Sequence, residues 1–288
     1  MNLLDETKML MRKYNIKANK NLGQNFLIDK QVIIDIVDSA EISKNDVVIE
    51  IGPGLGSMTQ VLLERAKKVI CIELDKKMIK VLSERFIAYN NFELIYGDVL
   101  KIDLRSIIEE EKNKEQNAIN IKIVANLPYY ITTPIIMKLL ESKLNIQSIT
   151  VMIQKEVAER LIEVPGGKNT GAITYTVYYY CEGRKVREVD SSSFIPAPDV
   201  TSEVINLYIR NMPPVDVKDE KIFFRIIKCA YMQRRKTLLN ALVNAKVFNS
   251  KEEGIHILKQ MNLSENVRAE ELRIQDFANL SNYFIKTI

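Results

Sequence analysis

The stretch Val47-Val48-Ile49-Glu50-Ile51-Gly52-Pro53-Gly54-Leu55-Gly56 joins a short apolar run to three closely spaced glycines. Such a run is typical of a buried strand, and glycines directly behind it let the backbone turn sharply and approach a ligand closely. Ser57 and Gln60 follow with the spacing of a capping box, so we expect a helix with Ser57 as its N-cap. This strand–loop–helix unit favours an open α/β sheet that binds a ligand beyond the carboxyl ends of its strands.

Similar apolar runs recur along the chain and alternate with amphipathic stretches. The predicted strands are 47–51, 69–72, 92–96, 121–125 and 148–153, and the predicted helices between them are 59–66, 76–86 and 134–140. This alternation indicates βα units and a mainly parallel sheet. The later runs 173–181 and 200–209 are rich in β-branched and aromatic residues. We expect them to form an antiparallel pair that completes the sheet.

A change of pattern follows the last predicted strand. Asn211-Met212-Pro213-Pro214 reads as a linker, because prolines interrupt both helices and central strands. Beyond it the chain turns helical, with predicted helices over 218–232, 236–245, 251–261 and 274–285. The sequence therefore predicts an α/β catalytic domain over residues 1–210 and a small all-α domain over residues 211–288.

The bulk composition excludes several classes of protein. The chain has 288 residues, of which 47% are hydrophobic, so it can bury one large core or two smaller ones. No apolar run approaches the length of a membrane span, and Met1–Glu6 lacks the basic and apolar parts of a secretory signal. Three widely separated cysteines and a single histidine show no metal-ligand spacing. We therefore expect a cytoplasmic protein with no metal and no membrane partner. We also predict a monomer, although the composition itself does not set the oligomeric state.

Two acidic positions extend the predicted ligand site beside the glycines. Glu73 ends the second predicted strand, where its carboxylate can accept hydrogen bonds from a ribose diol. Asp98 and Val99 follow the third, where a carboxylate and a backbone N–H can bind an adenine ring, although a plain surface turn is the alternative for Asp98. NAD and S-adenosylmethionine both suit these residues. The dinucleotide fingerprint prefers glycine or alanine where Ser57 stands, so the spacing favours S-adenosylmethionine.

The motif Asn126-Leu127-Pro128-Tyr129 stands just past the predicted strand 121–125. Open α/β sheets place their reactive groups at this end of their strands. The motif supplies an amide oxygen, a rigid proline turn and an aromatic face, which together suit gripping a flat base by its exocyclic amine. The alternative is a plain strand-to-helix turn at Pro128, with Tyr129 packed beneath it.

Taken together, these motifs resemble those of the ribosomal RNA adenine dimethyltransferase family, and the resemblance covers nearly the whole chain. Asn-Leu-Pro-Tyr is that family's form of the N/D-P-P-Y motif of amino-methyltransferases. The E-x-G-x-G-x-G loop over 50–56 is similar to the cofactor loop of class I methyltransferases. The other matching segments are Asn21–Asp29, Ser191–Pro198 with its F-x-P-x-P pattern, and Tyr231–Leu238. The resemblance implies a class I, Rossmann-like methyltransferase domain with a mainly parallel seven-stranded sheet.

The resemblance also implies an activity and a set of site residues. It implies S-adenosyl-L-methionine-dependent dimethylation at N6 of two adjacent adenines, in a hairpin loop near the 3′ end of 16S rRNA, during maturation of the small ribosomal subunit. The implied catalytic residues are Asn126, Leu127, Tyr129 and Phe194. The implied cofactor residues are Asn25, Leu27, Gly52, Gly54, Glu73, Asp98, Val99 and Asn126. Phe194 has an alternative role, which is to anchor its loop in the core. The family's Lys-Val-Asp pattern is replaced here by Asp199-Val200-Thr201.

The net charge of +4 is mild, but the basic residues are clustered. Basic clusters suit a phosphate backbone, whereas solvated surface charge is the plainer explanation of any one cluster. We predict RNA binding by Arg184, Lys185, Arg234, Arg235 and Lys236.

Three rival functions remain: a large-subunit rRNA methyltransferase of the macrolide-resistance type, a non-catalytic RNA-binding factor on a methyltransferase scaffold, and an NAD-dependent dehydrogenase. The dehydrogenase is disfavoured because the chain lacks a plausible histidine or tyrosine–lysine proton relay.

Overall fold

The computed structural model describes residues 2–19, 22–114, 119–233 and 235–286, which divide into two compact units. The first unit comprises Met1–Ala158 and Gly183–Ile209, and the second comprises Glu159–Glu182 and Arg210–Ile288. The later change of unit lies next to the boundary expected at residue 210. Residues 159–182 join the helical unit, although the sequence pattern assigned them to the α/β domain.

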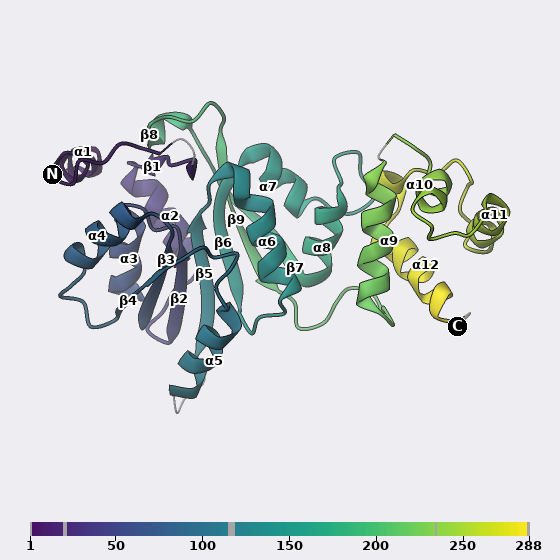
Figure 1. Ribbon diagram of the computed structural model, residues 1–288, viewed down its shortest axis with the longest axis horizontal. Helices are drawn as coiled ribbons and strands as arrows, with labels where there is room; N and C mark the ends of the chain where they lie inside the picture. Colours follow the sequence, from purple (N-terminus) through teal and green to yellow (C-terminus); the bar gives the residue numbers. More distant parts are fainter. Residues whose placement is uncertain (1, 20–21, 115–118, 234, 287–288) are drawn as a thin grey trace. The chain divides into compact units, whose positions relative to one another are not determined.

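The first unit is built on a seven-stranded sheet with the order β4-β3-β2-β5-β6-β9-β7 (Figure 1). The strands β2 to β6 pair in parallel, and β9 runs antiparallel to β6. The bounds are β2 Asp46–Ile51, β3 Lys68–Glu73, β4 Phe92–Tyr96, β5 Asn120–Asn126, β6 Ser148–Gln154, β7 Cys181–Val189 and β9 Ser202–Ile209. The mainly parallel seven-stranded sheet expected from the sequence is confirmed.

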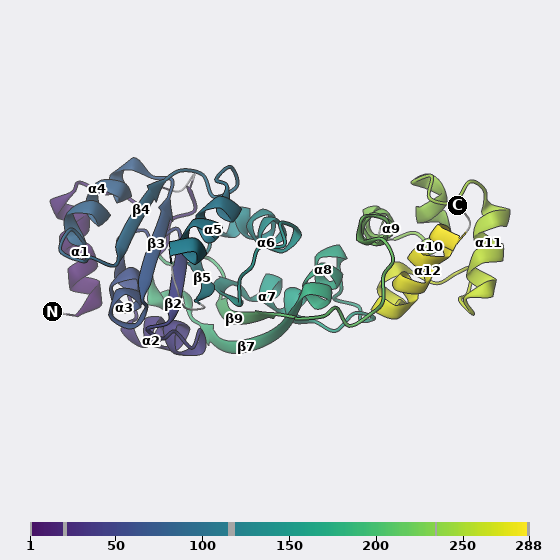
Figure 2. The same cartoon turned by 90° about the horizontal axis from the view of Figure 1, so that it is seen from below.

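Helices cover both faces of this sheet. On one face lie α2 Lys30–Ser39, α3 Ser57–Arg65 and α4 Lys76–Arg85, and on the other lie α5 Leu104–Lys114 and α6 Thr132–Glu141 (Figure 2). The apolar sides of α2, α3 and α4 pack onto β2 and β3 in one continuous core. Asp29 fixes the start of α2, because its carboxylate accepts hydrogen bonds from two backbone N–H groups of the first turn.

The capping box expected at the start of α3 is wrong. The N-cap is Gly56, with φ of 82° and no side-chain hydrogen bond, and Ser57 is already the first helical residue. The glycine loop ends in this left-handed residue, and the helix begins one position earlier than expected, at Ser57 instead of Met58. A Cβ at position 56 would stand 2.5 Å from Phe86 Cε2, so the loop packs here too closely on α4 for any side chain.

The strand expected over 173–181 is also wrong. The chain forms the helix α8 Ala172–Tyr180, and the edge strand β7 begins only at Cys181. The tyrosines of this run favour strands by local propensity, but here they pack at helical spacing into a helical core. Tyr175 is fully buried and donates a 2.6 Å hydrogen bond to the carbonyl of Leu272, while the Tyr179 and Phe223 ring centroids lie 5.4 Å apart. Tertiary packing therefore overrides the local preference.

The second unit is otherwise helical, as expected. It contains α9 Glu220–Met232, α10 Leu238–Asn244, α11 Lys251–Gln260 and α12 Ile274–Lys286, which share one apolar core with α8. The helix α7 Lys155–Ile162 crosses from the first unit into the second. Single 3-10 turns lie at Tyr129–Ile131 and Ser191–Ser193 in the first unit and at Ala269–Glu271 in the second. None of the helices in the described part of the chain is long and apolar enough to cross a membrane.

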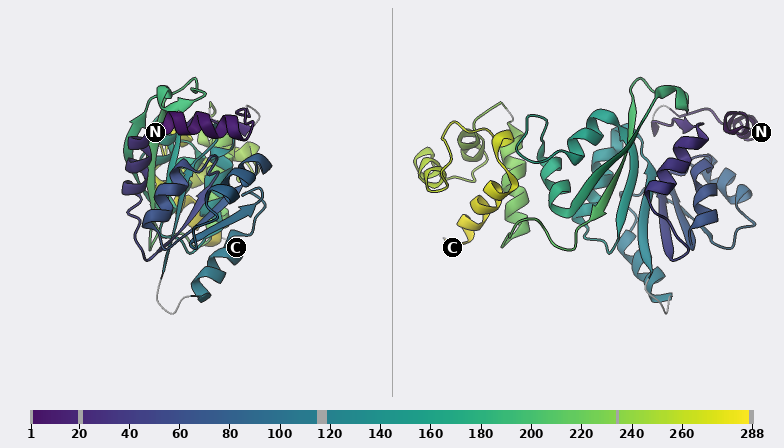
Figure 3. Two further views of the ribbon diagram at one scale, coloured as in Figure 1. Left: turned by 90° about the vertical axis from the view of Figure 1, so that its left-hand side faces the viewer. Right: turned by 180° about the vertical axis from the view of Figure 1, so that it is seen from behind.

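The N-terminal segment contributes two elements to the first unit. The helix α1 Leu3–Lys13 is followed by β1 Phe26–Leu27, which pairs antiparallel with β8 Phe194–Ile195 (Figure 3). Leu27 lies directly opposite Phe194 in this pair. Two segments about which the sequence pattern gave separate expectations are therefore brought side by side.

Candidate active site

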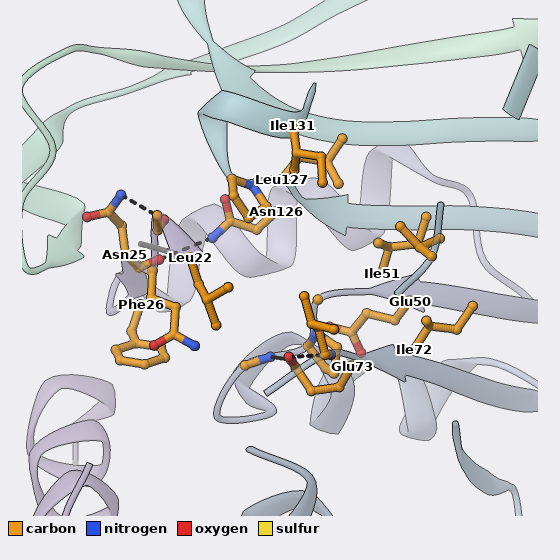
Figure 4. A pocket seen from close by; sticks show the side chains of 18 of the residues that line it. Leu22, Asn25, Phe26, Glu50, Ile51, Ile72, Glu73, Asn126, Leu127 and Ile131 are labelled. Carbon is orange, nitrogen blue, oxygen red and sulfur yellow. Dashed lines mark hydrogen bonds between the residues drawn. The ribbon is translucent and has the colours of Figure 1, made fainter. Parts of the chain in front are cut away.

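One pocket opens at the carboxyl ends of β2, β3, β4 and β5. It connects the glycine-rich loop to the Asn126–Tyr129 loop, and Figure 4 shows Asn25 and Asn126 at one end with Glu50 and Glu73 at the other. The predicted cofactor and catalytic residues that line it are Asn25, Leu27, Gly52, Gly54, Glu73, Asp98, Val99, Asn126, Leu127, Tyr129 and Phe194. Residues that lie far apart in the sequence, from Asn25 to Phe194, therefore line one cavity.

Gly52 shows why the loop needs glycine at the pocket wall. Its φ is 68°, a left-handed conformation that is strained for other residues. A Cβ built at this position meets no atom within 4 Å, so a side chain would project into open space at the pocket wall. The bare backbone at Gly52 leaves that space for a ligand.

The Glu73 carboxylate is held firmly at the end of β3. One oxygen accepts hydrogen bonds of 2.8 Å from the N–H groups of Leu74 and Asp75, and the other accepts one of 3.2 Å from Gly54. Burial raises the pKa of this carboxyl, and the three N–H donors partly oppose that rise. A carboxylate offers about four acceptor positions, so a place remains for a ligand hydroxyl.

Glu50 is a pocket residue that the sequence reasoning did not single out as a site residue. It is fully buried in β2, where one oxygen accepts a 2.6 Å hydrogen bond from Thr59 and the other has no protein partner. Burial raises the pKa of this carboxyl to about 7. An unpartnered buried oxygen at a pocket wall is a group that a ligand donor can satisfy. The available signal was the glutamate that opens the E-x-G-x-G-x-G loop, inside the predicted apolar strand 47–51.

Glu50 leads to a prediction for stability. Its pKa of about 7 in the folded protein exceeds the ordinary value of 4.5, so the folded state holds this proton more tightly than the unfolded chain does. The stabilisation that this proton gives the folded state is fully present below the pKa of the unfolded chain. It is lost as the pH rises through the pKa of the folded protein, and the total loss is about 3 kcal/mol. Urea unfolding without ligand at about pH 5 and about pH 8 should show a smaller pH-dependent loss in Glu50→Gln than in the wild type. Equal losses would show that Glu50 does not titrate in this way.

Arg85 supports the glycine loop from behind and was also missed. Its guanidinium donates to the backbone carbonyl of Leu55 at 3.0 Å and to the Gln60 side chain at 2.7 Å, and it forms an ion pair with Glu6 of α1. Leu55 lies between Gly54 and Gly56 and lines the pocket. The N-terminal helix is therefore tied to the loop through one side chain.

Asp98 both caps a turn and lines the pocket. One of its oxygens accepts a 2.9 Å hydrogen bond from the N–H of Leu100. Its side chain remains 27% exposed, and Val99 beside it is buried and also lines the pocket. The two alternatives for Asp98, turn residue and ligand residue, are therefore compatible.

The amide of Asn126 is oriented by the N-terminal segment. The strand β5 ends at Asn126, whose Nδ2 donates to the backbone carbonyl of Asn25 at 3.4 Å. The Nδ2 and Oδ1 atoms of the Asn126 amide point in different directions, so this bond turns Oδ1 away from the Asn25 carbonyl. Leu127 is 1% exposed, and its N–H donates to Met152 of β6 at 3.1 Å. The loop is therefore fixed at both residues that the sequence assigned to holding an amine.

Two aromatic side chains border the same space. The hydroxyl of Tyr129 is hydrogen bonded to that of Ser202 at 2.7 Å, and partial burial raises the Tyr129 pKa. Phe194 is 4% exposed and belongs to the apolar core, yet it also lines the pocket. Both expectations for Phe194, core anchor and pocket residue, describe its position.

The loop that carries Asn25 bridges the two halves of the pocket. Gln24 donates a 2.9 Å hydrogen bond to Asp75, which caps α4 next to Glu73. On the other side, a Cβ at Gly23 would stand 3.3 Å from both Pro128 and Tyr130. This short segment thus contacts the cofactor-type side and the Asn126–Tyr129 loop together.

The described RNA-binding candidates are not among the residues that line this pocket. In the first unit, Arg184 stacks on the ring of Tyr208 and Lys185 forms ion pairs with Glu188 and Glu203. In the second unit, Arg235 and Lys236 are exposed. Arg234 lies outside the described residues. Across the described ranges, no group of three or more His, Cys, Asp or Glu residues could hold a metal ion.

Comparisons with known proteins agree with this geometry. The family model described as Ribosomal RNA adenine dimethylase matches residues 15–286. A relative from Clostridium botulinum (strain Kyoto / Type A2), named "Ribosomal RNA small subunit methyltransferase A", is 48% identical over 96% of this chain and 97% of its own. A relative of the same name from Alkaliphilus oremlandii (strain OhILAs) is 46% identical over 98% of this chain and 97% of its own.

A solved structure shares the fold as well as the sequence pattern. The crystal structure of a dimethyladenosine transferase from Plasmodium falciparum superposes with a TM-score of 0.74 and 27% identity, covering 91% of this chain and 98% of that one. The seven-stranded sheet, with its pocket at the strand ends, is therefore the class I methyltransferase fold. With a family match over nearly its whole length, this chain is a methyltransferase that belongs to the ribosomal RNA adenine dimethylase family.

Proposed function

We propose that this protein dimethylates N6 of two adjacent adenines in a hairpin loop near the 3′ end of 16S rRNA. The methyl donor is S-adenosyl-L-methionine, and the reaction belongs to the maturation of the small ribosomal subunit. The observation that carries the proposal is the single pocket that joins the glycine-rich loop to Asn126. The names of the relatives, which specify the small subunit, support the choice of RNA.

The residues of the pocket fit this cofactor. The Glu73 carboxylate has acceptor capacity for the ribose hydroxyls, and Asp98 with the Val99 N–H suits the adenine ring. The unpartnered oxygen of Glu50 and the segment from Asn25 to Leu27 are left for the methionine part, whose ammonium group would favour the charged form of Glu50. When bound, the cofactor supplies an electrophilic methyl group on its sulfonium.

The acceptor side must improve a poor nucleophile. The lone pair of the adenine N6 amine is delocalised into the ring. Hydrogen bonds from this amine to Asn126 Oδ1 and to the Leu127 carbonyl favour sp³ character at nitrogen and stabilise the positive charge that develops there. The Asn126 amide is already oriented by Asn25, so little reorganisation is needed when the base enters.

Two rings hold the base in position. Tyr129 stacks on the adenine, with its ring fixed by the Ser202 hydroxyl, and Phe194 covers the other face. Stacking of this kind is worth about 1–3 kcal/mol per base. Loop adenines can be splayed out cheaply compared with paired ones, so the entry of the base costs little. The methylated nitrogen then releases its extra proton to water, so no titrating base is required, which agrees with a chain that contains one histidine.

Methyl incorporation into different RNAs tests this function. The protein is incubated with cofactor labelled in its methyl group and with naked 16S rRNA, immature small subunits or large subunits. We expect label in the small-subunit material, recovered by mass spectrometry as N6,N6-dimethyladenosine at two neighbouring positions. Label in the large subunit would favour the resistance-type activity. Cofactor binding without transfer to any RNA would favour a non-catalytic RNA-binding factor.

Arg235 and Lys236 are exposed in the second unit, and with the neighbouring Arg234 of the sequence they lead to a prediction for RNA affinity. Replacing Arg234, Arg235 and Lys236 by alanine should weaken binding to small subunits and flatten its salt dependence, because fewer phosphates are neutralised. The slope of log affinity against log salt should shrink by about 0.7–0.9 for each phosphate that is no longer neutralised. Lys246, Lys251 and Lys259, also exposed in this unit, provide a matched triple-alanine control. The same slope in both triple variants would place the RNA-binding surface elsewhere.

A further inference from the structure

Tyr130 is an aromatic residue at the pocket to which the reaction described above gives no role. It directly follows Tyr129, but the two side chains differ in setting. Tyr129 is partly buried and bonded to Ser202, whereas Tyr130 is 58% exposed while also lining the pocket. An aromatic side chain with this much exposed surface at a pocket rim is available to a ligand larger than the pocket itself.

The Tyr130 ring is supported on one side. A Cβ built at Gly23 would stand 3.3 Å from Tyr130 Cδ1 and 3.5 Å from Cε1, so the ring rests directly on the glycine backbone. Gly23 itself has φ of 58°, which disfavours any side chain there. The N-terminal segment therefore backs the ring, and the remaining surface is left open. A supported ring with a free side is the arrangement that stacking on a nucleobase requires.

The substrate presents a second base close to the first. When one adenine occupies the pocket, the adjacent nucleotide of a single-stranded loop has lost its stacking partner. Unstacked bases in RNA loops are commonly received by aromatic side chains. We propose that Tyr130 stacks on the nucleobase next to the adenine being methylated and thereby makes binding depend on that neighbour. This inference rests on the proposed function and names a specificity-determining residue within it.

Other exposed tyrosines provide the comparison. Tyr96 is 54% exposed and Tyr89 is 37% exposed, and neither is among the residues described as lining the pocket. A general affinity of exposed tyrosines for RNA would involve all three residues equally. The proposal assigns the effect to Tyr130 alone, so Tyr89→Ala and Tyr96→Ala are matched controls.

The test combines a protein change with an RNA change. Small subunits are reconstituted with 16S rRNA whose synthetic 3′ segment carries either an adenosine or an abasic nucleotide beside the target adenine. Single-turnover methylation of that target is measured for the wild type, Tyr130→Ala, Tyr130→Phe and the two controls. Thermal unfolding and cofactor affinity are recorded for every variant, so that a folding defect is seen directly.

We expect Tyr130→Ala to raise the RNA concentration for half-maximal rate by about 5-fold to 150-fold on the adenosine substrate. For the wild type, the abasic substrate should raise this RNA concentration by a similar factor. For Tyr130→Ala, the abasic and adenosine substrates should give nearly the same value, because that variant cannot stack on the neighbouring base in any case. Tyr130→Phe should retain the wild-type dependence on the neighbouring base. The inference would be overturned if Tyr130→Ala were weaker than the wild type by the same factor on both RNAs, or if it matched the wild type on both. An equal loss in the control variants would overturn it as well. A wild type that methylates neither RNA would instead refute the proposed function.

Discussion

Replacing Asn126 by alanine is expected to lower the rate of methyl transfer by about 100-fold or more, while cofactor affinity changes little. The side-chain oxygen at the end of β5 is one of the two acceptors assigned to the target amine. Its loss removes a preorganised interaction that matters most as positive charge develops on nitrogen. The Asn126 amide also donates to the Asn25 carbonyl at 3.4 Å. This hydrogen bond is long, so its loss should change the cofactor side of the pocket little. Single-turnover rates and cofactor titration separate the two effects.

A matched control lies in the same strand. Asn120 is at the opposite end of β5, where its amide donates to Asp46 at 3.0 Å. Asn120→Ala should retain transfer, apart from any change in thermal stability. Turnover by Asn126→Ala at the wild-type rate would remove this residue from the reaction. An equal loss in both variants would point to a general defect of the strand.

The second large effect is expected at Glu73. Glu73→Ala should weaken cofactor binding by about 1–3 kcal/mol, or about 5-fold to 150-fold, because buried ribose hydroxyls would lose their acceptor. Three backbone N–H groups, two in the β3–α4 turn and one at Gly54 in the glycine loop, would lose theirs as well. Glu73→Gln keeps the shape and one acceptor oxygen, so it should retain part of the affinity. Calorimetric titration of each variant with the cofactor measures the change.

The control for this prediction is Glu64, an exposed glutamate on α3 outside the described pocket lining. Glu64→Ala should bind the cofactor as the wild type does. Unchanged affinity in Glu73→Ala would show that the cofactor lies elsewhere. A collapse of thermal stability in Glu73→Ala alone is distinguished by Glu73→Gln, which preserves the side-chain volume in the turn.

The sheet could be predicted because its information is local. Strands β2 to β6 are short apolar runs closed by glycine, polar or proline residues, and buried parallel strands are expected to have this appearance. The helix α8 could not be predicted in the same way. Its run of tyrosines and β-branched residues has strand propensity, and only packing against Phe223 and Phe277 decides for a helix.

The pocket was predictable by position, and its supports were not. Glu73, Asp98 and Asn126 each end or follow a predicted strand, and parallel strands bring their carboxyl ends to one edge. Arg85 is different, because its partners Leu55 and Glu6 lie 30 and 79 residues away in sequence. No spacing within the chain announces such an interaction.

The same limit applies to the basic residues. Lys185 was expected to meet RNA, but the fold brings Glu203, a buried residue of β9, into an ion pair with it. A cluster of positive charge in the sequence therefore does not establish a free positive surface. Arg235 and Lys236 are exposed, so RNA binding remains the prediction for these two residues.

A crystal structure of the protein with S-adenosylhomocysteine, the product of the cofactor, tests the central claim most directly. The claim is that one cavity holds the cofactor against Glu73 and presents its reacting end to Asn126. We predict the ribose hydroxyls on the Glu73 carboxylate, the adenine beside Asp98 and Val99, and the sulfur facing Asn126. A ligand bound elsewhere, or one whose sulfur is walled off from Asn126 by protein side chains, would contradict the account.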